Sequence, residues 1–211
     1  MSALSGLLYI LNHLDLYLDM LIRNFGIWTY LILWLVIFLE TGLVVTPFLP
    51  GDSLIFIAGT FAAIGSMNVW LLFVLLWSAA VLGDTVNYWI GRKVGAKVFS
   101  LQNSKLFSKK NFDRTYHFYE KYGSQTIVLA RFIPIIRTFA PFVAGVAKMK
   151  YLTFVSYNII GAFLWVTLAL FLGYFFGNVP WIKNHFSIVI ILIIIISTLP
   201  VIYKFLFKSK K

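Results

Sequence analysis

The sequence predicts an all-α polytopic membrane protein whose transmembrane helices surround two opposed re-entrant hairpins, each made of a broken helix. The 211 residues are 61% hydrophobic and only 12% charged, a balance far from that of a soluble domain. The charges gather in a few segments between long apolar runs, and proline and glycine interrupt two of these runs. We therefore expect one integral membrane domain over residues 1–211.

The composition also excludes several classes of function. The net charge of +11 lies beside apolar spans, where insertion topology and anionic lipid head groups explain it better than a nucleic-acid partner does. The chain has no cysteine, and its three histidines lie in dissimilar segments, so we expect no metal site. No nucleotide-binding loop or nucleophile–base arrangement is present. We expect neither a cofactor nor an enzymatic activity.

Residues 1–24 predict an amphipathic helix. Asn12, Asp15, Asp19 and Arg23 follow one helical stripe, and leucine and isoleucine cover most of the remaining surface. Such a helix lies in the membrane interface or crosses the membrane with its polar stripe against the bundle. The sequence leaves both arrangements open.

Residues 27–64 predict the first re-entrant hairpin. Two uncharged runs flank an acidic interruption, and neither run reaches the ~20 residues that span a bilayer. A helix broken at membrane depth is tolerated only where protein or a water-filled cavity covers the freed backbone groups. The interruption contains two acids, Glu40 and Asp52, and three helix breakers, Pro47, Pro50 and Gly51.

Both acids are candidates for proton exchange, because a carboxylate in a poorly solvated cavity gains or loses a proton as its basic partner moves. Asp52 has a second interpretation as a helix N-cap, since it directly precedes a clean apolar run.

Residues 69–91 predict a transmembrane helix with a single acid, Asp84. Tyr88 lies one turn further on, and we expect the two to form a secondary, hydrogen-bonded polar pair near the end of the span. Gly83, Gly91 and Gly95 favour close helix packing. The following segment, residues 92–124, holds eight Lys and Arg residues against two acids, which places it in the cytoplasm by the positive-inside rule.

Residues 125–147 predict the second re-entrant hairpin, with basic residues at both ends. It contains Arg131 and Arg137, and its expected breakers are Pro134, Pro141 and Gly145. The rest of the sequence predicts two transmembrane helices, residues 151–176 and 186–203. A basic cytoplasmic tail, residues 204–211, follows them. This arrangement puts fourteen of the eighteen Lys and Arg residues inside.

Arg131 and Arg137 are candidates for binding a phosphate. An arginine at the bilayer centre costs roughly 2.5 kcal/mol or more, so both need partners or water. A guanidinium group matches phosphate oxygens in a bidentate manner and keeps its charge. The alternative is structural: the two arginines neutralise Glu40 and Asp52. Pro134 breaks the helix between them and so allows both side chains to converge.

Three segments of this sequence carry a family resemblance: residues 38–52 (FLETGLVVTPFLPGD), 83–95 (GDTVNYWIGRKVG) and 130–145 (ARFIPIIRTFAPFVAG). Together they resemble the DedA family of bacterial inner-membrane proteins, which shares its membrane domain with lipid scramblases of the eukaryotic endoplasmic reticulum. The resemblance implies opposed re-entrant hairpins, return of undecaprenyl phosphate across the membrane, dependence on the proton-motive force, and a role in envelope integrity.

The leading hypothesis is therefore a translocase of a polyprenyl phosphate or phospholipid in the bacterial cytoplasmic membrane. Its expected partners are membrane lipids and protons. A proton-coupled exporter or antiporter of a small cation or drug is the alternative, and the sequence does not decide whether the chain forms a homo-oligomer.

The topology can be tested by cysteine labelling, because the chain has no cysteine of its own. A single cysteine at position 105 should be protected from an impermeant reagent in intact cells and react after the membrane is opened. Labelling from the outside would contradict a cytoplasmic segment at residues 92–124.

Overall fold

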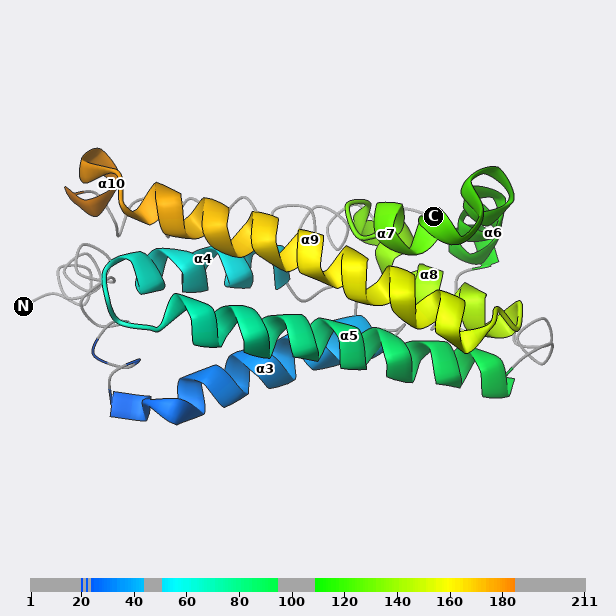
Figure 1. The fold of residues 1–211 in the computed structure, drawn as a ribbon, viewed down its shortest axis with the longest axis horizontal. Helices are drawn as coiled ribbons and strands as arrows, with labels where there is room; N and C mark the ends of the chain where they lie inside the picture. The colour runs from blue at the N-terminus through cyan, green and yellow to red at the C-terminus, as the bar shows by residue number, and fades with distance from the viewer. Residues whose placement is uncertain (1–19, 21, 23, 44–50, 95–108, 185–211) are drawn as a thin grey trace, which may run out of the picture. The chain divides into compact units, whose positions relative to one another are not determined.

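The computed structural model describes residues 20, 22, 24–43, 51–94 and 109–184. These residues form helices joined by turns, without a β-strand in the described ranges, which confirms the all-α fold class (Figure 1). The helices are α3 Ile27–Gly42, α4 Gly51–Ala63, α5 Val69–Val94, α6 Lys109–Tyr122, η2 Gly123–Gln125, α7 Thr126–Ala130, α8 Pro134–Val146, α9 Tyr151–Gly177 and α10 Pro180–Asn184.

The chain divides into two compact units. Unit 1 comprises Met1–Leu33, Pro50–Phe73 and Thr167–Lys211, and unit 2 comprises Trp34–Leu49 and Val74–Val166. In unit 1, glycines bring α4 close to the end of α9: an added Cβ at Gly59 or Gly173 would overlap the carbonyl of Leu170 or Phe56, respectively. Unit 2 contains every buried charged side chain of the described residues.

Two helices are long and apolar enough to cross a membrane, Val69–Lys93 with 25 residues and Tyr151–Gly177 with 27. At about 1.5 Å per residue both exceed the ~30 Å hydrocarbon core of a bilayer. Large apolar side chains of α9 such as Leu152, Leu172 and Phe175 are exposed. The expected spans at 69–91 and 151–176 correspond to these helices, whereas the helix at 1–24, the span at 186–203 and the tail at 204–211 fall outside the described residues, apart from a few positions near residue 24.

The first expected hairpin corresponds to α3 and α4, which have 16 and 13 residues. Each is shorter than the ~20 residues of a spanning helix. Gly51 begins α4, and Asp52 lies in its first turn. Pro47 and Pro50 lie outside the described residues.

The second expected hairpin corresponds to α7 and α8, separated by residues 131–133. Ile133 has an extended backbone, and Pro134 is the first residue of α8. A residue before proline avoids the helical region. Proline is tolerated at the first helical position because the N–H group that it lacks would have no acceptor within the helix there. Pro134 therefore marks the start of α8.

Pro141 and Gly145 do not break this hairpin, contrary to our expectation, because both lie inside α8. The helix ends with a Schellman-type cap: Lys148 has a φ of 54°, and the amides of Met149 and Lys148 donate to Ala144 and Gly145 at 3.0 Å each. Capping around Lys148 stops the helix, which leaves Gly145 free for another role.

Glycines bring α5 close to its neighbours in unit 2. An added Cβ at Gly91 would overlap the backbone carbonyl of Phe142, and one at Gly145 would overlap that of Tyr88. A Cβ at Gly83 would overlap Thr41 of α3. The packing role expected for Gly83 and Gly91 is confirmed, and Gly95 lies outside the described residues.

The close approach of α5 and α8 yields a stability prediction. Gly91→Ala should lower the free energy of unfolding by about 1–3 kcal/mol, because a clash with backbone cannot be relieved by a side-chain rotation. Gly42→Ala is the matched control: its Cβ would lie 3.4 Å from the carbonyl oxygen of Gly83, an ordinary contact. Thermal unfolding in detergent measures both, and equal stability of the two variants would contradict this packing.

Candidate functional site: two buried arginine–carboxylate pairs

Two buried ion pairs lie in unit 2. Nη2 of Arg137, on α8, donates to Oε1 of Glu40 at the end of α3, at 2.8 Å. Nη2 of Arg131, in the interruption between α7 and α8, donates to Oδ2 of Asp84 on α5. None of the four side chains is more than 8% exposed. The pairs therefore tie the second broken helix to α3 and α5.

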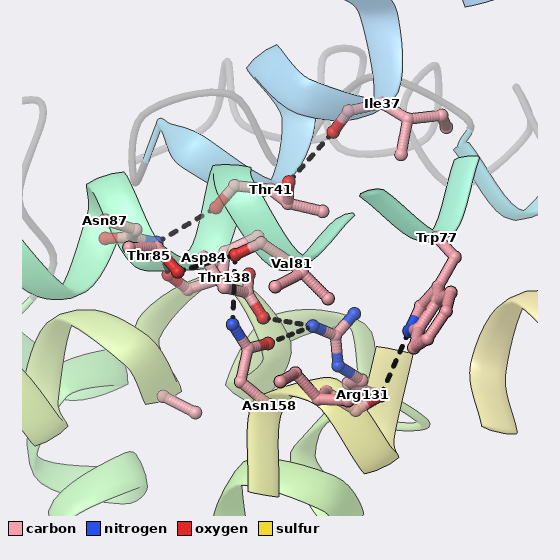
Figure 2. A network of polar contacts seen from close by, with 12 residues as sticks. Ile37, Thr41, Trp77, Val81, Asp84, Thr85, Asn87, Arg131, Thr138 and Asn158 are labelled. Carbon is pink, nitrogen blue, oxygen red and sulfur yellow. Dashed lines mark hydrogen bonds and ion pairs between the residues drawn. The ribbon is translucent and has the colours of Figure 1, made fainter. Parts of the chain in front are cut away.

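Asn158 of α9 completes the surroundings of Arg131. Figure 2 shows its side chain beside the guanidinium group, between Arg131 and Val81. The Asn158 Oδ1 atom accepts from Nη2 of Arg131 at 2.6 Å, and its Nδ2 atom donates to the carbonyl of Val81 at 3.0 Å. Arg131 is thus held by a carboxylate from α5 and an amide from α9.

Asn87 of α5 supports the other pair through the backbone. Its Nδ2 atom donates to the carbonyl of Thr41 at 3.1 Å and to that of Thr138 at 3.0 Å (Figure 2). These two residues directly follow Glu40 and Arg137 in the chain. Asn87 therefore links the backbones that carry the two partners of the pair.

Trp165 of α9 lies against both arginines. The Cζ atoms of Arg137 and Arg131 lie 4.9 Å and 5.9 Å from its ring centroid. The indole is buried, with 4% exposed. A desolvated cation over an indole ring is a favourable arrangement, so Trp165 helps to hold the two positive charges within one region of unit 2.

The packing of α6 against α8 involves a partly buried tyrosine, Tyr119. The Tyr119 hydroxyl donates to the carbonyl of Ala140 at 2.9 Å. Burial, and secondarily the negative charge of Asp84, raise the pKa of this hydroxyl well above its usual value. Tyr119 therefore stays protonated and acts as a donor to α8.

The structure brings together three of the four main candidate residues, Arg131, Arg137 and Glu40. The alternative that the two arginines neutralise Glu40 and Asp52 is correct for Glu40 and wrong for Asp52. Arg131 pairs with Asp84 and not with Asp52. Asp52 belongs to unit 1, where it is exposed in the first turn of α4. The reason is that residues 131–133 lie beside α5, which offers a carboxylate to the guanidinium group.

The expected pair of Asp84 and Tyr88 is also corrected, because each side chain has other partners. The Tyr88 hydroxyl donates to the carbonyl of Met149 at 2.5 Å and accepts from Arg92 Nη1 at 2.6 Å. Asp84 is occupied by Arg131. The two side chains lie on the same face of α5, one turn apart. At its own level Asp84 meets Arg131, whereas Tyr88 meets the carbonyl of Met149 just after α8.

Sequence reasoning missed Asn87, Asn158 and Trp165. The asparagines carried a usable signal, since a polar amide inside an apolar span is costly unless it finds a partner. Trp165 carried a weaker one: it lies well inside its helix, away from the span ends where tryptophan usually anchors a membrane protein.

Among the described residues the charges of the site balance, with two guanidinium groups facing two carboxylates. Among the described residues no group of three or more His, Asp or Glu side chains could hold a metal ion. The arrangement can bind an anion if the anion takes the place of a carboxylate or uses guanidinium N–H groups that the carboxylates leave free.

A double-mutant cycle should detect the buried pair of α3 and α8. Arg137→Ala should lower the free energy of unfolding by about 3–5 kcal/mol, because it leaves the Glu40 carboxylate buried without its ion-pair partner. Adding Glu40→Ala should recover a large part of that loss. Arg114→Ala is the control, since Arg114 is exposed on α6 and should cost about 1 kcal/mol or less. Additive losses in the double variant would contradict the pair.

The comparisons with known proteins agree on one family. The model of the VTT domain matches residues 49–175. The chain is 50% identical over 202 residues to Protein DedA of Escherichia coli strain K12, covering 95% of this chain and 92% of that protein. It is 42% identical over 168 residues to an uncharacterized membrane protein of Mycobacterium leprae, with 78% and 74% covered.

A further relative is the inner membrane protein YqjA of Escherichia coli strain K12, 35% identical over 152 residues, with 72% of this chain and 69% of the relative covered. No solved structure matches the chain. The names of these relatives agree with a membrane protein built on the apolar helices described above. The chain belongs to the DedA family of membrane proteins and carries its VTT domain.

Proposed function

We propose that this protein moves a lipid phosphate, undecaprenyl phosphate or a phospholipid, across the bacterial cytoplasmic membrane, and that Arg131 and Arg137 bind the phosphate. One observation carries the proposal. Arg131 is buried, yet its Nε and Nη1 atoms have no hydrogen-bond partner among the described residues. A buried donor without an acceptor is costly, and phosphate oxygens are matched acceptors for guanidinium N–H groups.

The balanced charge suggests how protons enter. Two arginines and two carboxylates leave no net charge for a phosphate to meet. Protonation of Glu40 or Asp84 would release one guanidinium group and favour binding of the anion, whereas loss of that proton would favour its release. Transport coupled to the proton-motive force would follow from this competition.

The same charges weigh against the small-cation alternative. Each of the two buried carboxylates, Glu40 and Asp84, already faces a guanidinium group, and a cation would have to displace that group while two positive charges stay close by. The exposed Asp52 is compatible with either substrate.

The membrane arrangement is part of the proposal. In it, residues 27–64 and 125–147 are re-entrant hairpins that enter from opposite faces, residues 92–124 and the C-terminus are cytoplasmic, and residues 1–24 form an amphipathic helix. The lengths of α3, α4, α7 and α8 support two broken hairpins, since none of these helices is long enough to span a bilayer. Lipid transport of this kind would support envelope integrity.

Substituting lysine for the arginines tests phosphate binding directly. Arg131→Lys and Arg137→Lys keep the charge that neutralises the carboxylates but lose the planar fork. Both variants should purify as folded proteins and bind a short-chain prenyl phosphate more weakly by about 1.5–3 kcal/mol, the range for a hydrogen bond to a charged group. Thermal stability measured in parallel separates folding from binding. Lysine variants that bind like the parent would leave the arginines as structural residues.

Proton coupling is tested at Glu40. In proteoliposomes Glu40→Gln should remove the dependence of transport on a pH gradient, because Gln keeps a hydrogen-bond acceptor for Arg137 but carries no titratable proton. Asp113→Asn is the control, since Asp113 is exposed on α6 and should leave the dependence intact. A Gln variant with full gradient dependence would contradict proton exchange at this residue.

A further inference from the structure

Arg131 uses only one of its three nitrogens within the described part of unit 2. Nη2 has two hydrogens and two acceptors, Oδ2 of Asp84 and Oδ1 of Asn158. A guanidinium group has five N–H donors, so three remain: one on Nε and two on Nη1. Both of these nitrogens are buried and lack a partner among the described residues. The side chain therefore divides into a held nitrogen and two nitrogens that can meet a ligand.

Asn158 is itself fixed in orientation. It is fully buried, with 0% exposed, and its Nδ2 atom donates to the Val81 carbonyl. This bond directs Oδ1 toward Arg131, because the reversed amide would point N–H groups at the guanidinium group. The hydrogen bond from Arg131 to Asn158 does not depend on protonation, since an amide oxygen accepts it at any physiological pH. Asp84, in contrast, loses its charge when it takes up a proton.

We propose that Asn158 is a positioning residue for the phosphate site: it holds Nη2 of Arg131 in place when Asp84 is protonated or displaced, so that Nε and Nη1 remain directed at the phosphate. This inference rests on the proposed function, and its ligand is the phosphomonoester group of a lipid. It gives the two acceptors of Nη2 different tasks. Asp84 balances the charge, and Asn158 keeps the geometry.

Gly161 of α9 lies against the unheld part of Arg131. A Cβ at Gly161 would lie 3.1 Å from both Cδ and Nε of Arg131 and 3.2 Å from Cα of Val128. A methyl group at this position would press on the Nε atom without removing Asp84 or Asn158. Gly161→Ala is therefore a second variant that disturbs the ligand side of Arg131 and leaves its held side intact.

The test uses ¹⁵N spectra of arginine side chains in the purified full-length protein. The chain has only five arginines, so each Nε signal can be assigned by substitution to lysine. Rotation about the Nε–Cζ bond exchanges Nη1 with Nη2, and two acceptors on Nη2 should slow this exchange. The probes are a short-chain prenyl phosphate, the prenyl alcohol of the same length, and inorganic phosphate.

In the parent protein, exchange at Arg131 should be slow, and the prenyl phosphate should shift its Nε signal. The alcohol should have no effect, and inorganic phosphate should produce the same shift only at much higher concentration if the prenyl chain contributes to binding.

Asn158→Ala should speed the exchange, most clearly at a pH low enough to protonate Asp84, and weaken binding of the prenyl phosphate by about tenfold, the effect of about one net hydrogen bond. Asn178→Ala is the matched control, because Asn178 is an exposed asparagine just after α9 whose side-chain amide donates to the Tyr174 carbonyl. It should change neither readout. If Asn158→Ala does not fold, Asn158→Leu removes the same acceptor at similar volume and should give the same two changes. Gly161→Ala tests the ligand side separately: it should keep the slow exchange but lose the prenyl-phosphate shift at Nε.

The outcomes separate this inference from the proposed function. Parent-like exchange and affinity in Asn158→Ala would overturn the positioning role while phosphate binding stands. A prenyl-phosphate shift that survives in Gly161→Ala would likewise overturn the assignment of Nε to the ligand. A parent protein that binds phosphate and alcohol equally would overturn the proposed function, and slow exchange in that protein would leave Asn158 as a structural partner alone.

Discussion

The burial of two guanidinium charges is the constraint on which unit 2 depends. Arginine keeps its proton under all physiological conditions, so a buried Arg131 or Arg137 needs an opposite charge and acceptors for its N–H groups. Acids for this purpose come from α3 and α5, and an amide acceptor comes from α9. The broken second helix is therefore attached to three other helices by its two arginines. Loss of either carboxylate would leave a guanidinium charge buried without its ion-pair partner, which is costly.

Close packing of backbones makes these pairs possible. Gly83 directly precedes Asp84 and Gly91 lies about one turn after Asn87 on α5, and Gly145 approaches the same helix from α8. Without side chains at these points, Asp84 and Asn87 can reach groups on the neighbouring helices directly. The glycines and the ion pairs depend on each other, because a side chain at these glycines would push the helices apart and separate the paired charges.

Much of this could be predicted from the sequence, and the reasons are local. Length and apolarity predict α5 and α9, and Pro134 predicts the start of α8 because proline excludes the preceding residue from a helix. The breakers Pro141 and Gly145 were assigned wrongly because a helix end depends on capping geometry, here around Lys148, and on packing that the sequence does not display. The candidate arginines and Glu40 stood out as charges in apolar runs. The partners of these residues could not be predicted. Whether Arg131 meets Asp84 or Asp52 depends on which helices are neighbours. Asn158 and Trp165 lie in α9, a helix whose faces look alike in the sequence.

The central claim is that unit 2 recognises a lipid by its phosphate. The most direct measurement is the rate at which a fluorescent short-chain prenyl phosphate crosses the bilayer of proteoliposomes, compared with a fluorescent glycolipid without phosphate in the same vesicles and with protein-free vesicles. The account predicts that the protein accelerates the prenyl phosphate and leaves the glycolipid near its protein-free rate. Equal acceleration of both lipids, or of neither, would contradict it.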